Sequence, residues 1–154
     1  RRRVALVDLD LQFGTVALSL DLEPSHGLRE ALENPNRIDG LFMDRVLVQH
    51  SERLFVLSAE ESPDEALLLD YGAVDLLMTE LRNKFHYVVV DLPRATSACT
   101  QQVLQSATDL LLVTDLSLAG MRDTMRITGT MSPRPASGGA PRRARSSTSR
   151  MKVP

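Results

Sequence analysis

Two carboxylates stand two positions apart where an apolar run ends, in the stretch VALVDLDLQFGT at residues 4–15. Residues two apart on a strand point to the same side, so Asp8 and Asp10 can face one site, roughly 6–7 Å apart along the chain. Two like charges in one crevice are costly unless a cation, a Lys or ordered water compensates them, and a bound divalent metal would do so. The pair therefore indicates a magnesium site completed by water and a nucleotide phosphate. The plain alternative is a strand end, where Asp is common because it favours turns.

Two further apolar runs end in polar side chains. Asp91 closes YVVVD, and Thr114 with Asp115 closes DLLLVTD. The run VVVDLP after an aromatic residue has the form of a Walker B strand, in which apolar residues are followed by an Asp that serves a metal site. A phosphoacceptor receiver domain also gathers acids after its first strand, but it needs an Asp after its third strand and a later Lys. LFVLSAEES offers only Glu60 and Glu61, and no Lys follows a late strand, so the receiver interpretation fails.

The elements that must position these acids alternate between strands and helices. Apolar runs predict strands over residues 3–9, 53–59, 87–92 and 109–115. Helical patterns occupy residues 27–34, 71–85, 97–107 and 117–127. In the clearest of them, Val74, Leu77, Met78 and Leu81 share one face. Strands separated by such helices pair in parallel. We therefore predict an α/β fold with an open, mostly parallel sheet, which binds ligands at the carboxyl ends of its strands.

The charge of the chain changes near residue 128. All 20 acidic residues precede position 124, whereas the last 26 residues carry six Arg or Lys and no acid. The tail is also rich in Ser, Pro, Ala and Gly, a composition that cannot offset the entropy of ordering. We expect one domain over residues 1–128 and a disordered basic tail over residues 129–154. The tail is either an arm for nucleic acid or anionic lipid or, as we prefer, out-of-frame translation of a GC-rich gene, which comparison of the three reading frames tests.

Composition limits the cellular setting. At 154 residues and 43% hydrophobic content, the chain has the size of about one domain. The single Cys99 cannot form an internal disulfide, which favours a reducing compartment. No apolar run approaches the ~18 residues that span a bilayer, and no signal-peptide pattern follows the three leading arginines. The chain starts without Met against a strand pattern, from which we expect that a preceding segment has been removed.

Five segments resemble the ATPase domain of the CpaE/TadZ pilus-assembly proteins, a branch of the MinD/ParA group of deviant Walker A ATPases. They are RVALVDLDLQFGTVALSLDLEP, GLREALENPNRIDG, LFVLSAEES, YVVVDLPR and DLLLVTDLSLAGMRDT. The resemblance covers roughly residues 3–127 in the same order and spacing, and DLDLQFGT with VVVDLPR is its most specific part. It implies a P-loop NTPase-like fold of the MinD/ParA type and, for the full-length family, ATP and Mg²⁺ as cofactors.

The resemblance also implies roles for individual residues. Asp8 and Asp91 would serve the magnesium ion, and Asp10 would position or activate the water that attacks the γ-phosphate. The remaining nucleotide-side positions are Gln12, Gly14 and Thr15 in the first switch loop and Pro93 with Arg94 at the start of the second. Gly14 would supply backbone freedom, or be an ordinary turn glycine. Positions 114–122 would border the base, although we prefer a strand end and a solvated helix face for Thr114, Asp115 and Arg122.

The sequence departs from this family at both ends. The group carries a glycine-rich loop of the form KGGxGxT before the strand that begins here at Arg3, and none of the 154 residues supplies it. Since that loop holds the phosphates, we expect no tight ATP binding or activity from this chain alone. The strand that carries the loop normally lies inside the sheet, so we also expect exposed strand edges. The fold is thus truncated at both ends relative to the family.

Three functions stay open. The first is an ATP-driven switch that positions the secretion machinery of a type IVb (Flp or tight-adherence) pilus. The second is a non-catalytic polar-localisation scaffold of the same fold, and the third is a ParA-type partitioning ATPase acting with DNA. For the first, the resemblance implies a homodimer in contact with pilus secretion proteins, without nucleic acid and with only indirect membrane contact. We expect it in the cytoplasm, at the cell pole or the inner face of the membrane.

Overall fold

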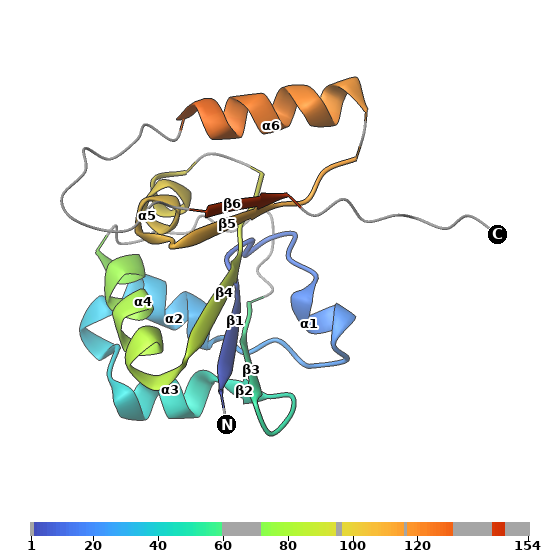
Figure 1. The fold of residues 1–154 in the computed structure, drawn as a ribbon. Coiled ribbons are helices and arrows are strands. Elements are labelled where there is room, and N and C mark those ends of the chain that lie inside the picture. Colours follow the sequence, from blue (N-terminus) through green and yellow to red (C-terminus); the bar gives the residue numbers. More distant parts are fainter. Residues whose placement is uncertain (1, 60–71, 95–96, 116, 131–142, 147–154) are drawn as a thin grey trace. The chain divides into compact units, whose positions relative to one another are not determined.

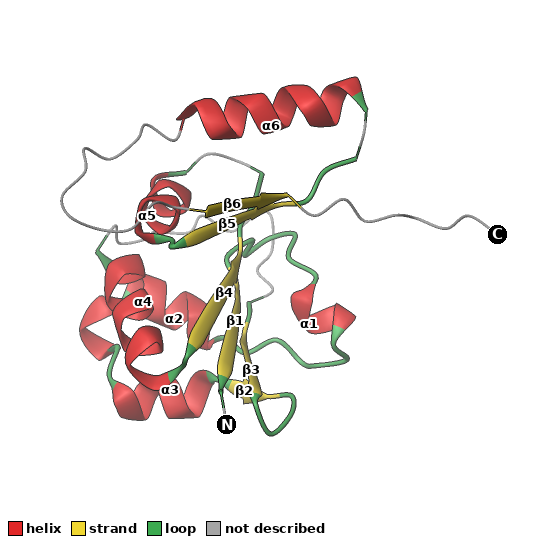
Figure 2. Cartoon of the chain, in the orientation of Figure 1, coloured by secondary structure: helices red, strands yellow, loops and turns green. Residues whose placement is uncertain are grey.

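The computed structural model describes residues 2–59, 72–94, 97–115, 117–130 and 143–146. The chain divides into two units, Arg1–Gln102 and Val103–Pro154, and each is considered by itself. Figure 1 labels the helices and strands along the chain, and Figure 2 colours them by type. In the described residues no helix has the length and apolar character needed to cross a membrane.

The first unit is built on a four-stranded sheet with the strand order β2-β3-β1-β4. Three strands, β1 (Val4–Asp8), β3 (Leu54–Leu57) and β4 (Tyr87–Asp91), run parallel, with β1 in the centre. The short strand β2 (Val48–Gln49) is antiparallel to β3. The predicted open, mostly parallel sheet is therefore confirmed, and its three parallel strands are the apolar runs expected from the sequence.

Helices connect or follow these strands. They are α1 (Val16–Ser19), α2 (Gly27–Glu33), the 3-10 helix η1 (Pro35–Arg37), α3 (Gly40–Val46), α4 (Ala73–Lys84) and α5 (Ala98–Ser106), the last of which follows β4. The predicted helices over residues 27–34, 71–85 and 97–107 correspond to α2, α4 and α5. The pattern did not predict α1 or α3, which have four and seven residues. α1 is about one turn long, and the apolar residues Leu41, Phe42 and Met43 of α3 are consecutive rather than at a helical spacing. Figure 1 shows α2, α3 and α4 on one side of the sheet and α1 on the other.

The core of the first unit lies between the sheet and α4. The predicted apolar face of α4, made by Val74, Leu77, Met78 and Leu81, is at most 2% exposed at every position. Facing residues of the sheet, among them Val7, are likewise buried. Burying a side chain of this size stabilises a fold by about 1.5–3 kcal/mol, so this layer stabilises the sheet on that face.

The other face of the sheet is thinly covered at β4. Tyr87 and Val89 are 47% and 51% exposed, although strands of parallel sheets are ordinarily covered on both faces. β4 pairs with β1 along one edge, and no strand among the described residues pairs with its other edge. β4 is thus an apolar edge strand, which is the kind of strand that accepts another strand.

The second unit holds β5 (Asp109–Leu112), α6 (Leu118–Thr130) and β6 (Arg143–Ser146). β5 and α6 correspond to the runs predicted over 109–115 and 117–127. β5 pairs in parallel with β6 in a separate two-stranded sheet. Within residues 129–154, where we expected disorder, α6 reaches Thr130 and β6 forms a strand. The rest of that tail lies outside the described residues, so for it the expectation stays a prediction.

Candidate functional site

Acidic residues meet where β1 and β4 end. The two strands are neighbours in register, with Val4 opposite Tyr87 and Asp8 opposite Asp91. The backbone N–H of Leu9 donates to the carbonyl oxygen of Asp91 over 2.9 Å, which carries the pairing to the end of both strands. The structure therefore brings Asp8 and Asp91 together at the carboxyl edge of the sheet, the edge where open α/β sheets bind ligands.

Asp8 is buried and holds the loop that follows β1. Its residue is 1% exposed, yet both carboxylate oxygens accept a backbone hydrogen bond. Oδ1 accepts the N–H of Asp10 and Oδ2 accepts the N–H of Val16, each over 3.1 Å. Val16 is the first residue of α1, so Asp8 ties both ends of the loop to the end of β1. Hydrogen bonds to a charged group are stronger than neutral ones, which makes Asp8 the anchor of this loop.

Asp10 and Gly14 close the loop on itself. The N–H of Gly14 donates to the carbonyl oxygen of Asp10 over 2.7 Å, and the N–H of Phe13 donates to Asp10 Oδ1 over 3.2 Å. A Cβ on Gly14 would lie within 3.0 Å of both Asp8 Oδ2 and the Asp10 carbonyl oxygen. The φ angle of Gly14 is outside the left-handed range. The position needs glycine for space, whereas the sequence suggested backbone freedom or a turn.

The other predicted positions lie on the same two loops. Gln12 is half-buried in the turn before Gly14, and Thr15 is exposed at the start of α1, where its side chain makes no capping bond. Pro93 follows β4 and is half-buried. All three are thus within a few residues of Asp8 or Asp91 along the chain, on the loops that leave the carboxyl edge.

The electrostatics of this edge favour a cation. Burial raises the pKa of Asp8 above its ordinary value of 3.8, and the charges of Asp91 and Asp10 raise it further, while the N–H groups of Val16 and Asp10 oppose the shift. The Asp91 residue is exposed, and its carboxylate makes no hydrogen bond or ion pair with the described residues. A divalent ion would relieve the repulsion among these carboxylates.

The donor set fits magnesium better than an ion that needs a full protein cage. Within the described ranges, no three His, Cys, Asp or Glu side chains converge on one metal position. Magnesium commonly keeps several waters and takes only one or two protein carboxylates. Asp91 is the exposed carboxylate at this edge, whereas Asp8 is buried and each of its oxygens accepts one backbone N–H bond.

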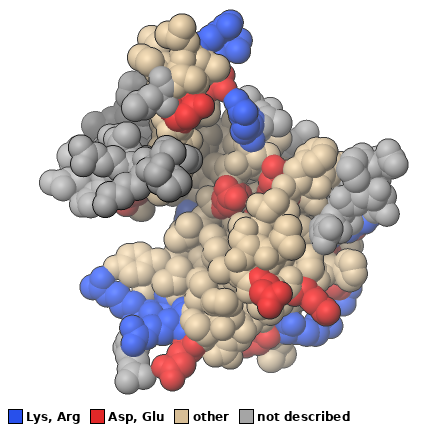
Figure 3. All heavy atoms as spheres, turned by 90° about the vertical axis from the view of Figure 1, so that its right-hand side faces the viewer, with Lys and Arg blue, Asp and Glu red and all other residues tan. Residues whose placement is uncertain are grey.

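The opposite end of the strands is basic. Arg3 and Arg53 precede β1 and β3, and the guanidinium carbon of Arg3 lies 4.4 and 4.9 Å from the ring centroids of Phe55 and Phe85. In the first unit, Figure 3 shows Lys and Arg side chains gathered toward the end at which the chain begins. Asp8 and Asp91 therefore lie at the opposite end of their strands from Arg3, although Asp and Glu also stand among the arginines there.

Thr114 and Asp115 start the second unit's helix. Asp115 Oδ1 accepts the N–H and the hydroxyl of Ser117, over 3.3 and 2.6 Å. The Ser117 hydroxyl oxygen in turn accepts the N–H of Gly120 over 3.0 Å, which caps α6. Thr114, Asp115 and Arg122 are exposed between the end of β5 and the first turns of α6, and a role for positions 114–122 beside a base stays a prediction.

Two exposed apolar side chains near the carboxylates were not singled out by the sequence. Phe13 and Leu18, in the loop after Asp10 and in α1, are 69% and 81% exposed. Scattered exposed apolar residues are common, so neither would be notable alone. Phe13 lies on the loop that Asp8 holds and Leu18 on the helix that follows it, whereas the neighbouring Leu11 and Ala17 are buried.

Comparison with known proteins identifies the fold. The chain is 26% identical over 131 residues to the septum site-determining protein MinD of Helicobacter pylori, which covers 83% of the chain. A ParA family ATPase from Chlorobium tepidum superposes with a TM-score of 0.72 at 20% identity, over 94% of the chain and 60% of that structure. MinD from Pyrococcus horikoshii, in complex with Mg-ADP, gives 0.65 at 19% identity over 84% of the chain and 52% of that structure. No protein-family model matches the chain.

These likenesses establish the α/β fold of the MinD/ParA ATPases, which belong to the P-loop NTPases. The chain spans about half the length of the curated relative, 47% of it.

Proposed function

We propose that the chain is part of a CpaE/TadZ-type pilus-assembly ATPase that acts as a nucleotide-dependent switch. It supplies the carboxylate residues of the nucleotide site. One observation carries the proposal: Asp8 and Asp91 end neighbouring strands in register, and Asp8 holds the loop that bears Asp10. Catalysis of phosphoryl transfer depends on positioned carboxylates, a metal ion and an oriented water rather than on covalent chemistry. The likeness to a MinD structure with Mg-ADP supports the same ligand class.

In this proposal ATP and Mg²⁺ are the cofactors. Magnesium supplies charge neutralisation at the phosphates, and Asp91 holds it through a water. Asp8 supports the magnesium shell by fixing the loop, and Asp10 orients the water that attacks the γ-phosphate. The loop residues Gln12, Gly14 and Thr15 form the first switch, and Pro93 begins the second.

The phosphates need a partner that the 154 residues do not contain. A glycine-rich loop at the start of a helix ordinarily binds them through backbone N–H groups, and the sequence has no such loop. We place the loop on a further strand that pairs with the free edge of β4, where Tyr87 and Val89 are half exposed. The active ATPase is then a longer protein, and this chain alone binds ATP weakly.

The proposed assembly is a homodimer that meets at the Asp8 end of the sheet. Phe13 and Leu18 give that end an exposed apolar surface beside Asp10, and contact there would exclude water from the nucleotide. The dimer acts on pilus secretion proteins in the cytoplasm, at the cell pole or the inner face of the membrane. It needs no nucleic acid, and its contact with the membrane is indirect.

A scaffold without turnover is the second candidate, favoured by the missing glycine-rich loop. The gene sequence upstream of Arg3 separates the two. An intact KGGxGKT supports the switch, and a degraded loop supports the scaffold. A receiver-like domain further upstream supports the pilus branch over ParA-type partitioning.

The decisive experiment extends the chain by its own upstream coding sequence and measures ATP hydrolysis with and without Mg²⁺. We expect turnover only in the extended protein. Asp10→Asn should lower kcat at least 100-fold while nucleotide binding persists, and Asp91→Asn should raise the Mg²⁺ concentration that half-maximal activity requires. Asp75→Asn, at an exposed position in the first turn of α4, is the matched control. Normal hydrolysis by both site variants would refute the proposal.

A further inference from the structure

A hollow beside α3 lies away from the carboxylates of the proposed nucleotide site. It has a volume of about 420 Å³ and is lined by Arg37, Asp39, Leu41, Phe42 and Arg45. In Figure 1, α3 lies near the end of the sheet at which β1 begins, whereas Asp8 is at the other end of β1. We call this feature the α3 hollow. None of its residues has a part in the proposed switch, so the two proposals can be tested separately.

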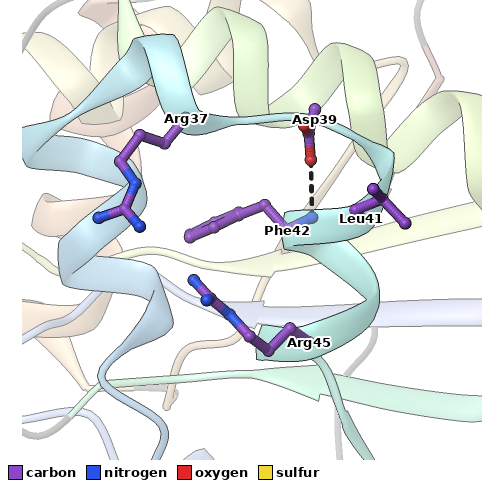
Figure 4. A pocket seen from close by; sticks show the side chains of 5 residues that line it. All are labelled: Arg37, Asp39, Leu41, Phe42 and Arg45. Atoms are coloured by element: carbon purple, nitrogen blue, oxygen red, sulfur yellow. Dashed lines mark hydrogen bonds between the residues drawn. The ribbon is translucent and has the colours of Figure 1, made fainter.

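Two arginines present their guanidinium groups at the α3 hollow. Figure 4 shows the guanidinium groups of Arg37 and Arg45 on either side of the Phe42 ring, and the Arg45 guanidinium carbon is 5.5 Å from that ring's centroid. Both arginines pair with one carboxylate, Glu30 of α2. Arg37 Nη1 contacts Glu30 Oε1, and Arg45 Nη2 is 3.5 Å from Glu30 Oε2. The shared carboxylate holds the two groups near each other before any ligand arrives.

Most of the hydrogen-bond donors of these arginines are left for another partner. A guanidinium group has five N–H donors, and the contacts between each arginine and Glu30 join a single nitrogen to a single oxygen. The side chains of Arg37 and Arg45 are 56% and 61% exposed. Because guanidinium geometry suits carboxylates, the hollow offers directional sites for one acidic group.

The remaining lining limits which anion fits. Asp39 also lines the hollow, and its Oδ1 is fixed by accepting the Phe42 N–H over 2.7 Å. The formal charges of Asp39 and Glu30 cancel those of Arg37 and Arg45, so a polyanion such as DNA or a phosphate-rich surface gains little. Leu41 is 82% exposed at the rim and offers contact area to an apolar group.

We propose that the α3 hollow binds a short segment of a partner protein in which one carboxylate lies next to a large apolar side chain. The carboxylate accepts N–H bonds from Arg37 and Arg45, and the apolar side chain packs on Leu41. The chain's own tail is a poor match, because residues 129–154 contain no Asp or Glu side chain. The unused N–H donors of the two guanidinium groups and the apolar rim, rather than net charge, together select a peptide with one acid beside an apolar side chain.

The test selects a displayed library of seven-residue peptides for binding to the full 154-residue chain. A parallel selection on an Arg37→Gln/Arg45→Gln variant identifies the peptides whose enrichment depends on the two arginines. We expect enriched peptides to carry one Asp or Glu beside Leu, Ile or Phe. The best peptide is then synthesised with a fluorophore, together with a copy whose acid is replaced by its amide. Anisotropy titrations should give about tenfold weaker binding for the amide peptide and for Arg45→Gln, as expected for loss of one charge-assisted bond.

Matched variants separate a binding site from general charge or folding effects. Arg53→Gln removes an exposed arginine elsewhere in the first unit, and Leu76→Ser removes a leucine that is 47% exposed on α4. Both should leave the dissociation constant unchanged, whereas Leu41→Ser should weaken binding severalfold. Thermal unfolding confirms that every variant is folded.

Three results would overturn the proposal. The first is a selection that enriches no acidic, apolar peptides. The second is equal binding to the chain and its double-arginine variant. The third is binding of duplex DNA, or of vesicles with 20% phosphatidylserine, that depends on Arg37 and Arg45 while the selected peptide does not bind.

Discussion

Replacing Gly14 by alanine tests directly whether Asp8 holds the loop after β1. The new Cβ would lie within 3.0 Å of Asp8 Oδ2 and of the Asp10 carbonyl oxygen, closer than such atoms approach in proteins. Asp8 is buried with both oxygens bonded, and the Asp10 oxygen belongs to the backbone. Neither atom moves without breaking the arrangement that closes the loop.

The size of the effect follows from what must give way. If the loop keeps its hydrogen bonds, the substitution overpacks a filled site, which costs about 1–3 kcal/mol. If Asp8 Oδ2 moves away, the bond from the Val16 N–H is lost, and a hydrogen bond to a charged group contributes about 1.5–3 kcal/mol. Moving Asp8 Oδ2 away relieves the overpacking but loses the hydrogen bond, so the two free-energy costs do not add. We expect the free energy of unfolding to fall by about 2 kcal/mol.

Urea denaturation at pH 7, followed by far-ultraviolet circular dichroism, measures this difference. Gly40→Ala is the matched control in the same unit, because its Cβ would meet only Lys84 Cε at 3.8 Å and Lys84 Nζ at 4.0 Å. Gly40 is the first residue of α3, so alanine there should be neutral or stabilising by up to ~1 kcal/mol. Equal stability of the Gly14→Ala and Gly40→Ala proteins would refute the reasoning.

Three further substitutions have defined outcomes. Because burial raises the pKa of Asp8 above 3.8, the folded state binds that proton more tightly than the unfolded state. The wild type should therefore gain stability relative to Asp8→Asn as pH falls from neutral toward 3.8. Urea titrations in which the free energy of unfolding changes equally with pH in both proteins would contradict this. Lys84→Met removes 2.6 Å contacts of Nζ with the Gly40 carbonyl oxygen and Asp44 Oδ1. Denaturation should show a loss of about 1 kcal/mol that shrinks in high salt. Val89→Lys places a charge on the edge strand and should reduce concentration-dependent association in sedimentation velocity, with stability changed by less than ~0.5 kcal/mol; unchanged sedimentation would count against an adhesive β4.

The strands and the long helix could be predicted because their signals are local. β1 and β4 are Val- and Leu-rich runs closed by Asp8 and Asp91, and they occupy almost the predicted positions. The apolar spacing in α4 gives its buried face directly. In each case the pattern repeats over enough residues to select one structure and to mark which side meets the core.

Some short elements escaped prediction because their local sequence pattern is weak. α3 has seven residues, and its clearest local signal is Asp39, which caps the helix by accepting the Phe42 N–H. β2 has two residues, and it is defined as a strand by its hydrogen-bonded pairing with β3. The pairing of β5 with β6 joins residues more than 30 positions apart, and no local pattern encodes it.

The sequence by itself determined that acids follow the apolar strands at Asp8, Asp10 and Asp91, because strand length and side-chain alternation are properties of neighbouring residues. Only the tertiary structure decided that β1 and β4 lie side by side and that Asp8 turns inward to hold its loop while Asp91 stays exposed. Strand order and burial arise from contacts between distant segments, and those contacts set which carboxylate anchors the backbone and which is available to a metal ion.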